Sequence, residues 1–321
     1  MEKKRKSNPS RGRKTGHKKS VHYRKRLPMV LSGLIVAAGL MLLFTIHFWN
    51  VQAPNNTTEV LRGNTVNQTL LAAQITPAAG YTLSFKWGDS IHKLVETGAL
   101  NVANLSIILN NSGQPLTPVE KEILNGTYNG YIRFNQTNTE FVQLALWSLG
   151  INNNNTVITN GTIMHYGGSP YNLASTGGYG ALGKLQLGEL DIINLNSQQQ
   201  ALMYDVATHS YRPCCDNPTA FPDCNHGAAA LGLIELLASQ GANESQMYSA
   251  VREFYQYQFP QQYAEIAAYF DSHGENYSQV NSSEVMSYNF SSYSGFSNVN
   301  QYLTKNRILQ QTTSGGASCG A

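Results

Sequence analysis

Three of the four cysteines of this chain, together with one histidine, fall within a short proline-rich stretch. Two adjacent cysteines, Cys214 and Cys215, are separated by eight residues from Cys224, and His226 follows two positions later. Thiolates and a neutral imidazole are ligands that zinc, copper(I) and iron accept. The spacing differs from the standard zinc motifs. The stretch therefore predicts a soft metal or metallocofactor, such as a Zn, Cu or Fe ion, without identifying it.

The same cysteines allow two other interpretations. In an oxidising compartment four cysteines usually form two disulfides, and the adjacent Cys214 and Cys215 would most easily pair with different partners, such as Cys224 and Cys319. The chain would then be a disulfide-stapled cell-surface binding or structural domain without metal. The third interpretation is a hydrolase in which Cys224 and His226 form a nucleophilic pair. No catalytic residue is assigned, and the sequence leaves open whether the protein is an enzyme.

Several polar residues near this stretch could support a site. Asp216, Asp223 and Glu235 could be ligands, or could orient the ring of His226. Glu235 is the only acid of an otherwise apolar segment, and its simpler interpretation is an exposed surface residue. His165 lies in a Gly-rich segment, residues 161–188, and could complete a site, although a hydrogen-bonded loop histidine is the commoner role.

The stretch has a resemblance to known proteins. Residues 211–227 contain Pro-Cys-Cys followed by Asn-Pro-Thr-Ala-Phe-Pro-Asp-Cys-Asn-His-Gly. This pattern resembles a motif of membrane-anchored prokaryotic proteins for which no activity is established. Phe-Lys-Trp-Gly-Asp at 85–89 and Ser-Cys-Gly at 318–320 are similar too. The resemblance implies one continuous domain that carries the cysteines, and it implies no function.

The N-terminal end predicts a membrane anchor. Residues 1–26 contain 12 Lys or Arg and a single acid, a composition typical of a disordered tail. Residues 27–49 carry no formal charge, and a helix of that length, about 34 Å, would cross the hydrocarbon core of roughly 30 Å. Because the cations precede this segment, we expect a cytoplasmic N-terminus and an extracytoplasmic C-terminal part. An apolar run of this length favours an uncleaved signal-anchor over a cleaved signal peptide.

The partners expected from the tail are membrane lipids, because its cations would contact anionic headgroups. Nucleic acid is the less favoured partner of the same cations. A cell-surface protein is a further candidate partner of the outer domain.

The outer part has a different composition from the tail. Residues 51–321 contain 10 Lys or Arg and 18 Asp or Glu. Charged residues are therefore few for a soluble domain. Asn-x-Ser/Thr sequons begin at thirteen positions after the anchor: Asn55, Asn56, Asn67, Asn104, Asn110, Asn125, Asn135, Asn154, Asn160, Asn243, Asn276, Asn281 and Asn289. A chain rich in Asn, Ser and Thr produces sequons by chance, but their location agrees with a glycoprotein domain outside the cell.

The hydrophobic pattern predicts a mainly α fold, in which one transmembrane helix precedes a single helix-rich domain with long Gly- and Asn-rich loops. We expect a linker at 50–80, the domain at 81–311 and a Gly-rich tail carrying Cys319 at 312–321. Helices are predicted over 89–100, 118–124, 139–149, 198–209, 227–240, 243–258, 261–270 and 299–309. Capping boxes begin at Thr117 and at Asn243. The nearly uninterrupted apolar run at 227–240 predicts a central buried helix.

Overall fold

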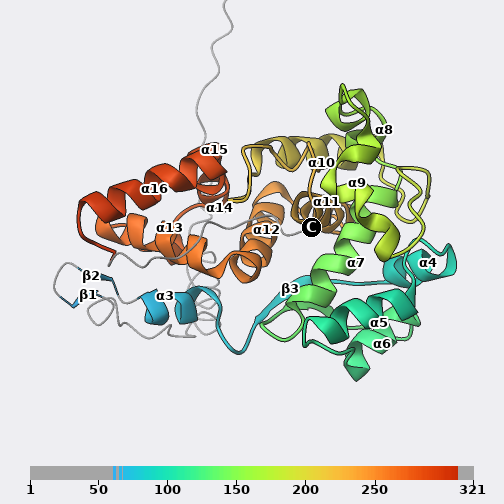
Figure 1. Cartoon of the computed structure of the whole chain (residues 1–321), viewed down its shortest axis with the longest axis horizontal. Helices are drawn as coiled ribbons and strands as arrows, with labels where there is room; N and C mark the ends of the chain where they lie inside the picture. Colours follow the sequence, from blue (N-terminus) through green and yellow to red (C-terminus); the bar gives the residue numbers. More distant parts are fainter. Residues whose placement is uncertain (1–60, 63–64, 67, 310–321) are drawn as a thin grey trace, which may run out of the picture. The chain divides into compact units, whose positions relative to one another are not determined.

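The computed structural model describes residues 61–62, 65–66 and 68–309. These residues form a mainly α-helical domain (Figure 1), as the sequence predicts. The basic tail (1–26), the predicted anchor (27–49) and the Gly-rich tail (312–321) lie outside the described residues. Among the helices within the described ranges, none combines the length and the apolar composition needed to cross a bilayer.

Two buried helices cross at the centre of the domain, α7 (Thr139–Asn152) and α11 (Asn225–Ser239). Both are buried along most of their length, and glycines stand where their backbones meet. A Cβ atom at Gly150 would lie 2.0 Å from the carbonyl oxygen of Ala228, and one at Gly232 would lie 2.3 Å from that of Leu146. Only glycine permits this approach. The crossing thereby fixes the start of α11, which carries part of the candidate site.

Five further helices belong to the helical part of the domain: α10 (Ser197–His209), α12 (Glu244–Gln258), α13 (Pro260–Ser272), α3 (Gln68–Ile75) and α16 (Tyr293–Lys305). Helices α10 and α12 pack against α11, whereas α13 packs against α3 and α16. The chain turns from α12 into α13 at Phe259, directly before a proline at the first position of α13. A proline is tolerated there because the first amide of a helix has no intrahelical partner.

The N-terminal part of the domain contains a two-stranded sheet. Strands β3 (Tyr81–Lys86) and β4 (Tyr131–Phe134) pair antiparallel, with Tyr81 opposite Phe134. Between them the chain forms α4 (Ser90–Glu96), α5 (Val102–Asn111) and α6 (Pro118–Leu124). A short hairpin, β1 (Leu61–Arg62) and β2 (Thr65–Val66), precedes α3. Single-turn helices occupy the loops: α8 (Thr156–Thr159), α9 (Ala174–Gly177), α14 (Ser282–Val285), α15 (Tyr288–Ser291) and 3₁₀ turns at Thr162–His165, Pro170–Asn172, Tyr179–Ala181 and Tyr277–Gln279.

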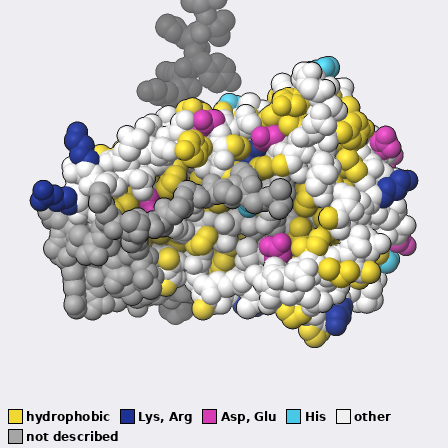
Figure 2. Space-filling model, viewed as in Figure 1, with side chains coloured by type: hydrophobic (Ala, Val, Ile, Leu, Met, Phe, Trp, Pro, Cys, Tyr) yellow, Lys and Arg dark blue, Asp and Glu magenta, His cyan; other side chains and the backbone are white. Residues whose placement is uncertain are grey.

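Charged side chains are scattered over the domain surface. On the face shown in Figure 2, isolated charges stand among neutral polar and hydrophobic groups. This agrees with the overall composition, in which Asp, Glu, Lys and Arg supply only 13% of the residues. A surface of this kind changes its charge little with pH.

The predicted helices are confirmed where local signals define them. Both predicted capping boxes are present, at Thr117 before α6 and at Asn243 before α12. The predicted linker at 50–80 is wrong at its C-terminal end, because α3 packs against α13 and buries Leu71 and Ile75. The domain therefore begins before residue 81.

Candidate metal site

The cysteine loop, residues 210–224, connects α10 to α11 and is fastened at its base. The amide of Thr219 donates to the carbonyl of Ser210 (2.8 Å), and the hydroxyl of Ser210 donates to that of Thr219 (3.0 Å). The next amide, that of Ala220, donates to the carbonyl of Ala207 on α10 (2.8 Å). Because the loop closes on itself, the cysteines near its start and its end come together.

Arg212 lies fully buried at the centre of the cysteine loop. Its guanidinium group donates to four oxygen partners: the carbonyls of Asn217 (3.0 Å), Pro218 (3.1 Å) and Phe221 (3.2 Å), and the carboxylate of Asp223. The side-chain amide of Asn217 donates to the other oxygen of Asp223 (2.9 Å). A buried cation is tolerated only when it is paired and hydrogen-bonded. These contacts make Arg212 the group around which the loop is built.

The remaining donor of Arg212 reaches a cysteine. Nε of Arg212 donates to Sγ of Cys224 (3.1 Å). Cys224 is also the N-cap residue of α11, and the amide of Gly227 donates to the same sulfur (3.5 Å). A Cβ atom at Gly227 would lie 2.6 Å from Cζ of Arg212, so glycine makes room for the guanidinium. Burial opposes the charge of Arg212, but the neighbouring Cys224 and other acidic groups raise its pKa well above its ordinary value. A guanidinium and a helix N-terminus both favour the thiolate form of Cys224.

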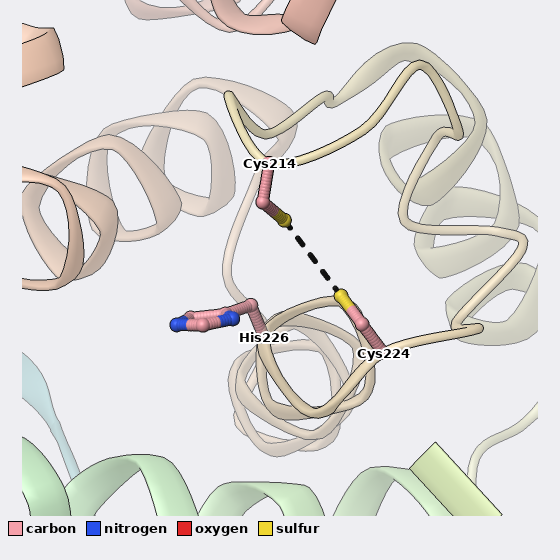
Figure 3. A group of neighbouring side chains, drawn as sticks. All are labelled: Cys214, Cys224 and His226. Carbon is pink, nitrogen blue, oxygen red and sulfur yellow. Dashed lines mark hydrogen bonds between the residues drawn. The ribbon is translucent and has the colours of Figure 1, made fainter. Parts of the chain in front are cut away.

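Three of the predicted ligands converge in space. The ligand atoms of Cys214, Cys224 and His226 all lie within 4.8 Å of one another. The sulfur atoms of Cys214 and Cys224 are 3.9 Å apart and face each other in Figure 3, while the ring of His226 lies to one side. Nδ1 of His226 is buried and has no hydrogen-bond partner within the described part of the chain. A buried, unsatisfied nitrogen beside two sulfur atoms is an arrangement that a metal ion would complete.

Cys215, the fourth predicted ligand, belongs to a different group. Its sulfur lies within 4.8 Å of ligand atoms of Asp223 and Cys224. A hydrogen bond with Cys214 lowers the pKa of the Cys215 thiol, whereas Cys224 and burial raise it. The pKa of Cys215 is thereby raised to about 11. Burial raises the pKa of Asp223, although the charge of Arg212 opposes that shift. Because Arg212 already binds Asp223, this second group is a poor place for a further cation.

The other residues considered from the sequence lie elsewhere. Asp216 accepts hydrogen bonds from the amide (2.8 Å) and the hydroxyl (2.7 Å) of Ser294 at the start of α16. Glu235 is fully buried in the middle of α11, which contradicts its interpretation as an exposed residue. It stands nine positions after His226, or about 13 Å along the helix, so it does not orient that ring. His165 is exposed and belongs to neither cysteine group.

Sequence reasoning missed one residue that shapes this site, Arg212, which lies fully buried at the centre of the cysteine loop. A signal for Arg212 was available, because it is the only Lys or Arg between Lys184 and Arg252 and stands two positions before Cys214.

Comparison with protein-family models, with curated proteins and with solved structures finds no match for this chain. Its function therefore has to be argued from the chemistry of the site.

Proposed function

We propose that this chain is a membrane-tethered extracytoplasmic protein whose helical domain holds one soft or borderline metal ion. The ligands are Cys214, Cys224 and His226. The observation that carries the proposal is the buried Nδ1 of His226, which has no hydrogen-bond partner in the described ranges and stands beside two sulfur atoms. Cys215, predicted from the sequence as a fourth ligand, could join this shell only by reorienting its side chain.

The distance between the sulfur atoms supports this proposal. Two thiolates bound at about 2.3 Å to a tetrahedral metal ion lie about 3.8 Å apart. The sulfur atoms of Cys214 and Cys224 are 3.9 Å apart, close to that value. The hydrogen bonds from Arg212 and from the amide of Gly227 to Cys224 are of the kind that orient and stabilise a metal-bound thiolate.

The charge balance of the site favours a divalent ion. Arg212 and Asp223 form an ion pair and cancel, which leaves the two thiolates as the net charge. A divalent cation would neutralise them, whereas copper(I) would leave one negative charge in a mostly buried site. Zinc(II) and iron(II) are therefore preferred to copper(I) among the ions that such ligands accept.

The extracytoplasmic location rests on the sequence of the tail and anchor, and one observation on the domain agrees with it. Ten of the thirteen sequon asparagines lie in the described residues, from Asn104 to Asn289, and none of the ten is buried. Other asparagines of the domain, such as Asn152, Asn153 and Asn155, are fully or almost fully buried. A glycoprotein needs its acceptor asparagines at the surface. Membrane lipids at the anchor, and a cell-surface protein at the domain, are the partners that this location implies.

A disulfide-stapled domain without metal is the alternative function. Cys214 and Cys224 would need to approach from 3.9 Å to about 2.0 Å, which a small side-chain rotation can provide. Cys319, the other predicted pairing partner, lies outside the described residues. The Cys–His hydrolase is less well supported, because Cys224 is only 5% exposed and its sulfur already accepts hydrogen bonds from Arg212 and Gly227.

Metal and thiol analysis of the purified full-length chain in detergent tests this proposal. We expect about one metal ion per chain, with the ligand thiols reactive only after chelation or acid treatment. Cys224→Ser and His226→Ala should each strongly reduce the metal content, because each removes one ligand from a shared shell. Cys215→Ser and His209→Ala, an exposed histidine on α10, should retain it.

The same measurements can contradict the proposal. A metal-free protein without free thiols would establish the disulfide alternative, in which His226→Ala leaves stability nearly unchanged. Reduction would then lower the free energy of unfolding by about 2–4 kcal/mol per bridge.

A further inference from the structure

The contacts that close the cysteine loop do not depend on a metal ion. They are the hydrogen bonds between Ser210 and Thr219 and those from Arg212 to three carbonyls of the loop. None of these contacts uses a sulfur atom. Because they fasten both ends of the loop, Cys214 and Cys224 are kept near each other whether or not an ion is bound.

The sulfur atoms of Cys214 and Cys224 are also placed for a covalent bond. They are 3.9 Å apart and face each other in Figure 3. A disulfide requires about 2.0 Å, a difference that rotation of the two side chains can cover. Cys214 is half-buried, whereas Cys224 is only 5% exposed. A reagent from solvent therefore reaches Cys214 first, and Cys224 reacts with it through Cys214.

The charge of the site is balanced in two different states. Arg212 and Asp223 form an ion pair and cancel. A divalent ion with two thiolates adds no net charge, and neither does a disulfide between the same two cysteines. Two thiolates without an ion would leave two negative charges in a mostly buried site, which is costly. The site therefore accommodates either the ion or the disulfide better than it accommodates two bare thiolates.

We propose that the metal site is redox-gated: reduced Cys214 and Cys224 accept the ion, and without the ion a small-molecule disulfide oxidises them to an intramolecular bridge that blocks metal binding. This inference rests on the proposed function, because it assigns a regulation to the same ligands. The bridge consumes both sulfur ligands and leaves the single imidazole of His226, which is too few ligands for a protein metal site. The bound ion and the bridge therefore exclude each other.

The oxidation is an ordinary thiol–disulfide exchange in two steps. The thiolate of Cys214 attacks one sulfur of the small disulfide, whose S–S bond breaks and releases one small thiolate. The thiolate of Cys224 then attacks Sγ of the mixed disulfide on Cys214 and expels the second small thiolate. The two cysteines lose two electrons, the small disulfide gains them, and an excess of small thiol reverses both steps.

Cys215 is the competing partner, because its sulfur also lies within 4.8 Å of that of Cys224. Its backbone is fixed on both sides. Its amide donates to the carbonyl of Arg212 (3.4 Å), and its carbonyl accepts from the amide of Tyr293 at the start of α16 (3.0 Å). These bonds resist the movement that a bridge from Cys215 would require, so we expect the bridge at Cys214.

Disulfide mapping and zinc titration of the full-length chain in detergent test this gating. After chelation, oxidised glutathione should convert the metal-free chain to the Cys214–Cys224 bridge, detected by mass spectrometry of an alkylated digest. The bridged chain should bind no zinc(II) in competition with a chromophoric chelator, and dithiothreitol should restore the binding. Cys215→Ser is the matched control and should behave like the parent chain at each step.

The rate of bridge formation gives a second readout. With free zinc(II) held at about 100 times its Kd, only about 1% of the chains are metal-free, so bridge formation should slow about 100-fold. Zinc retained by the bridged chain, or a bridge between Cys215 and Cys224, would overturn the proposal. A parent chain that binds zinc but forms no bridge would refute the gating and leave the metal site intact. A chain that forms the bridge but binds no zinc after reduction would refute the metal site, and the gating with it.

Discussion

Ionisable side chains are buried at the start and in the middle of α11, and their surroundings differ. At its start, Arg212 has a complete set of partners, including Asp223 and the sulfur of Cys224, and it remains charged. In its middle, Glu235 is equally buried, yet neither carboxyl oxygen has a hydrogen bond within the described part of the chain. The side chains of Asn153 and Asn155 are near enough to oppose the shift, but burial raises the pKa of Glu235 well above its ordinary value.

The contrast shows what a buried charge requires. Arg212 stays charged because the cysteine loop supplies oxygen and sulfur acceptors around its whole guanidinium group. Glu235 lacks such partners, so the neutral acid is its favoured form in the folded state. The start of α11 therefore accommodates a buried charge, whereas its middle belongs to the neutral core.

Removing Arg212 should have the largest effect. Arg212→Ala leaves Asp223 and several loop carbonyls without their donor, and we expect the free energy of unfolding to fall by about 3–5 kcal/mol. Chemical unfolding of the full-length chain measures this loss, with the exposed Lys184→Ala as the control. A loss below about 1 kcal/mol would show that the loop does not depend on Arg212.

The pH dependence of stability tests the other half of the comparison. The pKa of Glu235 is raised in the folded state, so its contribution to stability is complete below its unfolded pKa of about 4.5 and is lost as pH rises towards the folded pKa. In that window one such group lowers the free energy of unfolding by about 1.4 kcal/mol per pH unit. Glu235→Gln should remove this part of the slope, and the exposed Glu189→Gln should not.

Glu253 should add a slope of the same sign over a narrower pH range. Burial raises its pKa to about 7, with Arg252 and Ser249 opposing the shift, so its contribution is lost between about pH 4.5 and 7. A stability that rises with pH across this range would contradict both assignments.

The smallest expected effect concerns Gly227, which makes room for Arg212. An alanine inside a helix normally stabilises it by up to about 1 kcal/mol relative to glycine. Here the added Cβ would meet the guanidinium at 2.6 Å, and we expect Gly227→Ala to destabilise the fold by about 1–3 kcal/mol. In the Arg212→Ala background the same change should become stabilising, and a double-mutant cycle measures this reversal. Gly180→Ala, at an open and exposed position, is the control.

The elements predicted correctly are those with signals inside their own sequence. Helices α6 and α12 follow capping boxes, and α11 follows from a long apolar run. The β3–β4 pair was missed because its strands are separated by three helices, and strand pairing at that distance leaves no local pattern. Helix α3 was missed because its polar surroundings resemble a linker, although its packing against α13 makes it part of the domain.

The features of the candidate site also fall into those that neighbouring residues predict and those that depend on the fold. The sequence by itself determined the ligand types, the proximity of Cys224 and His226 and the helix that begins there, because these depend on residues that are neighbours along the chain. Only the tertiary structure decided that Cys214, rather than Cys215, joins His226, because that choice depends on how the loop folds around Arg212. It also decided that Glu235 belongs to the core. Burial and long-range electrostatics depend on which helices cross, and the glycines of α7 and α11 fix that crossing only when both helices are present.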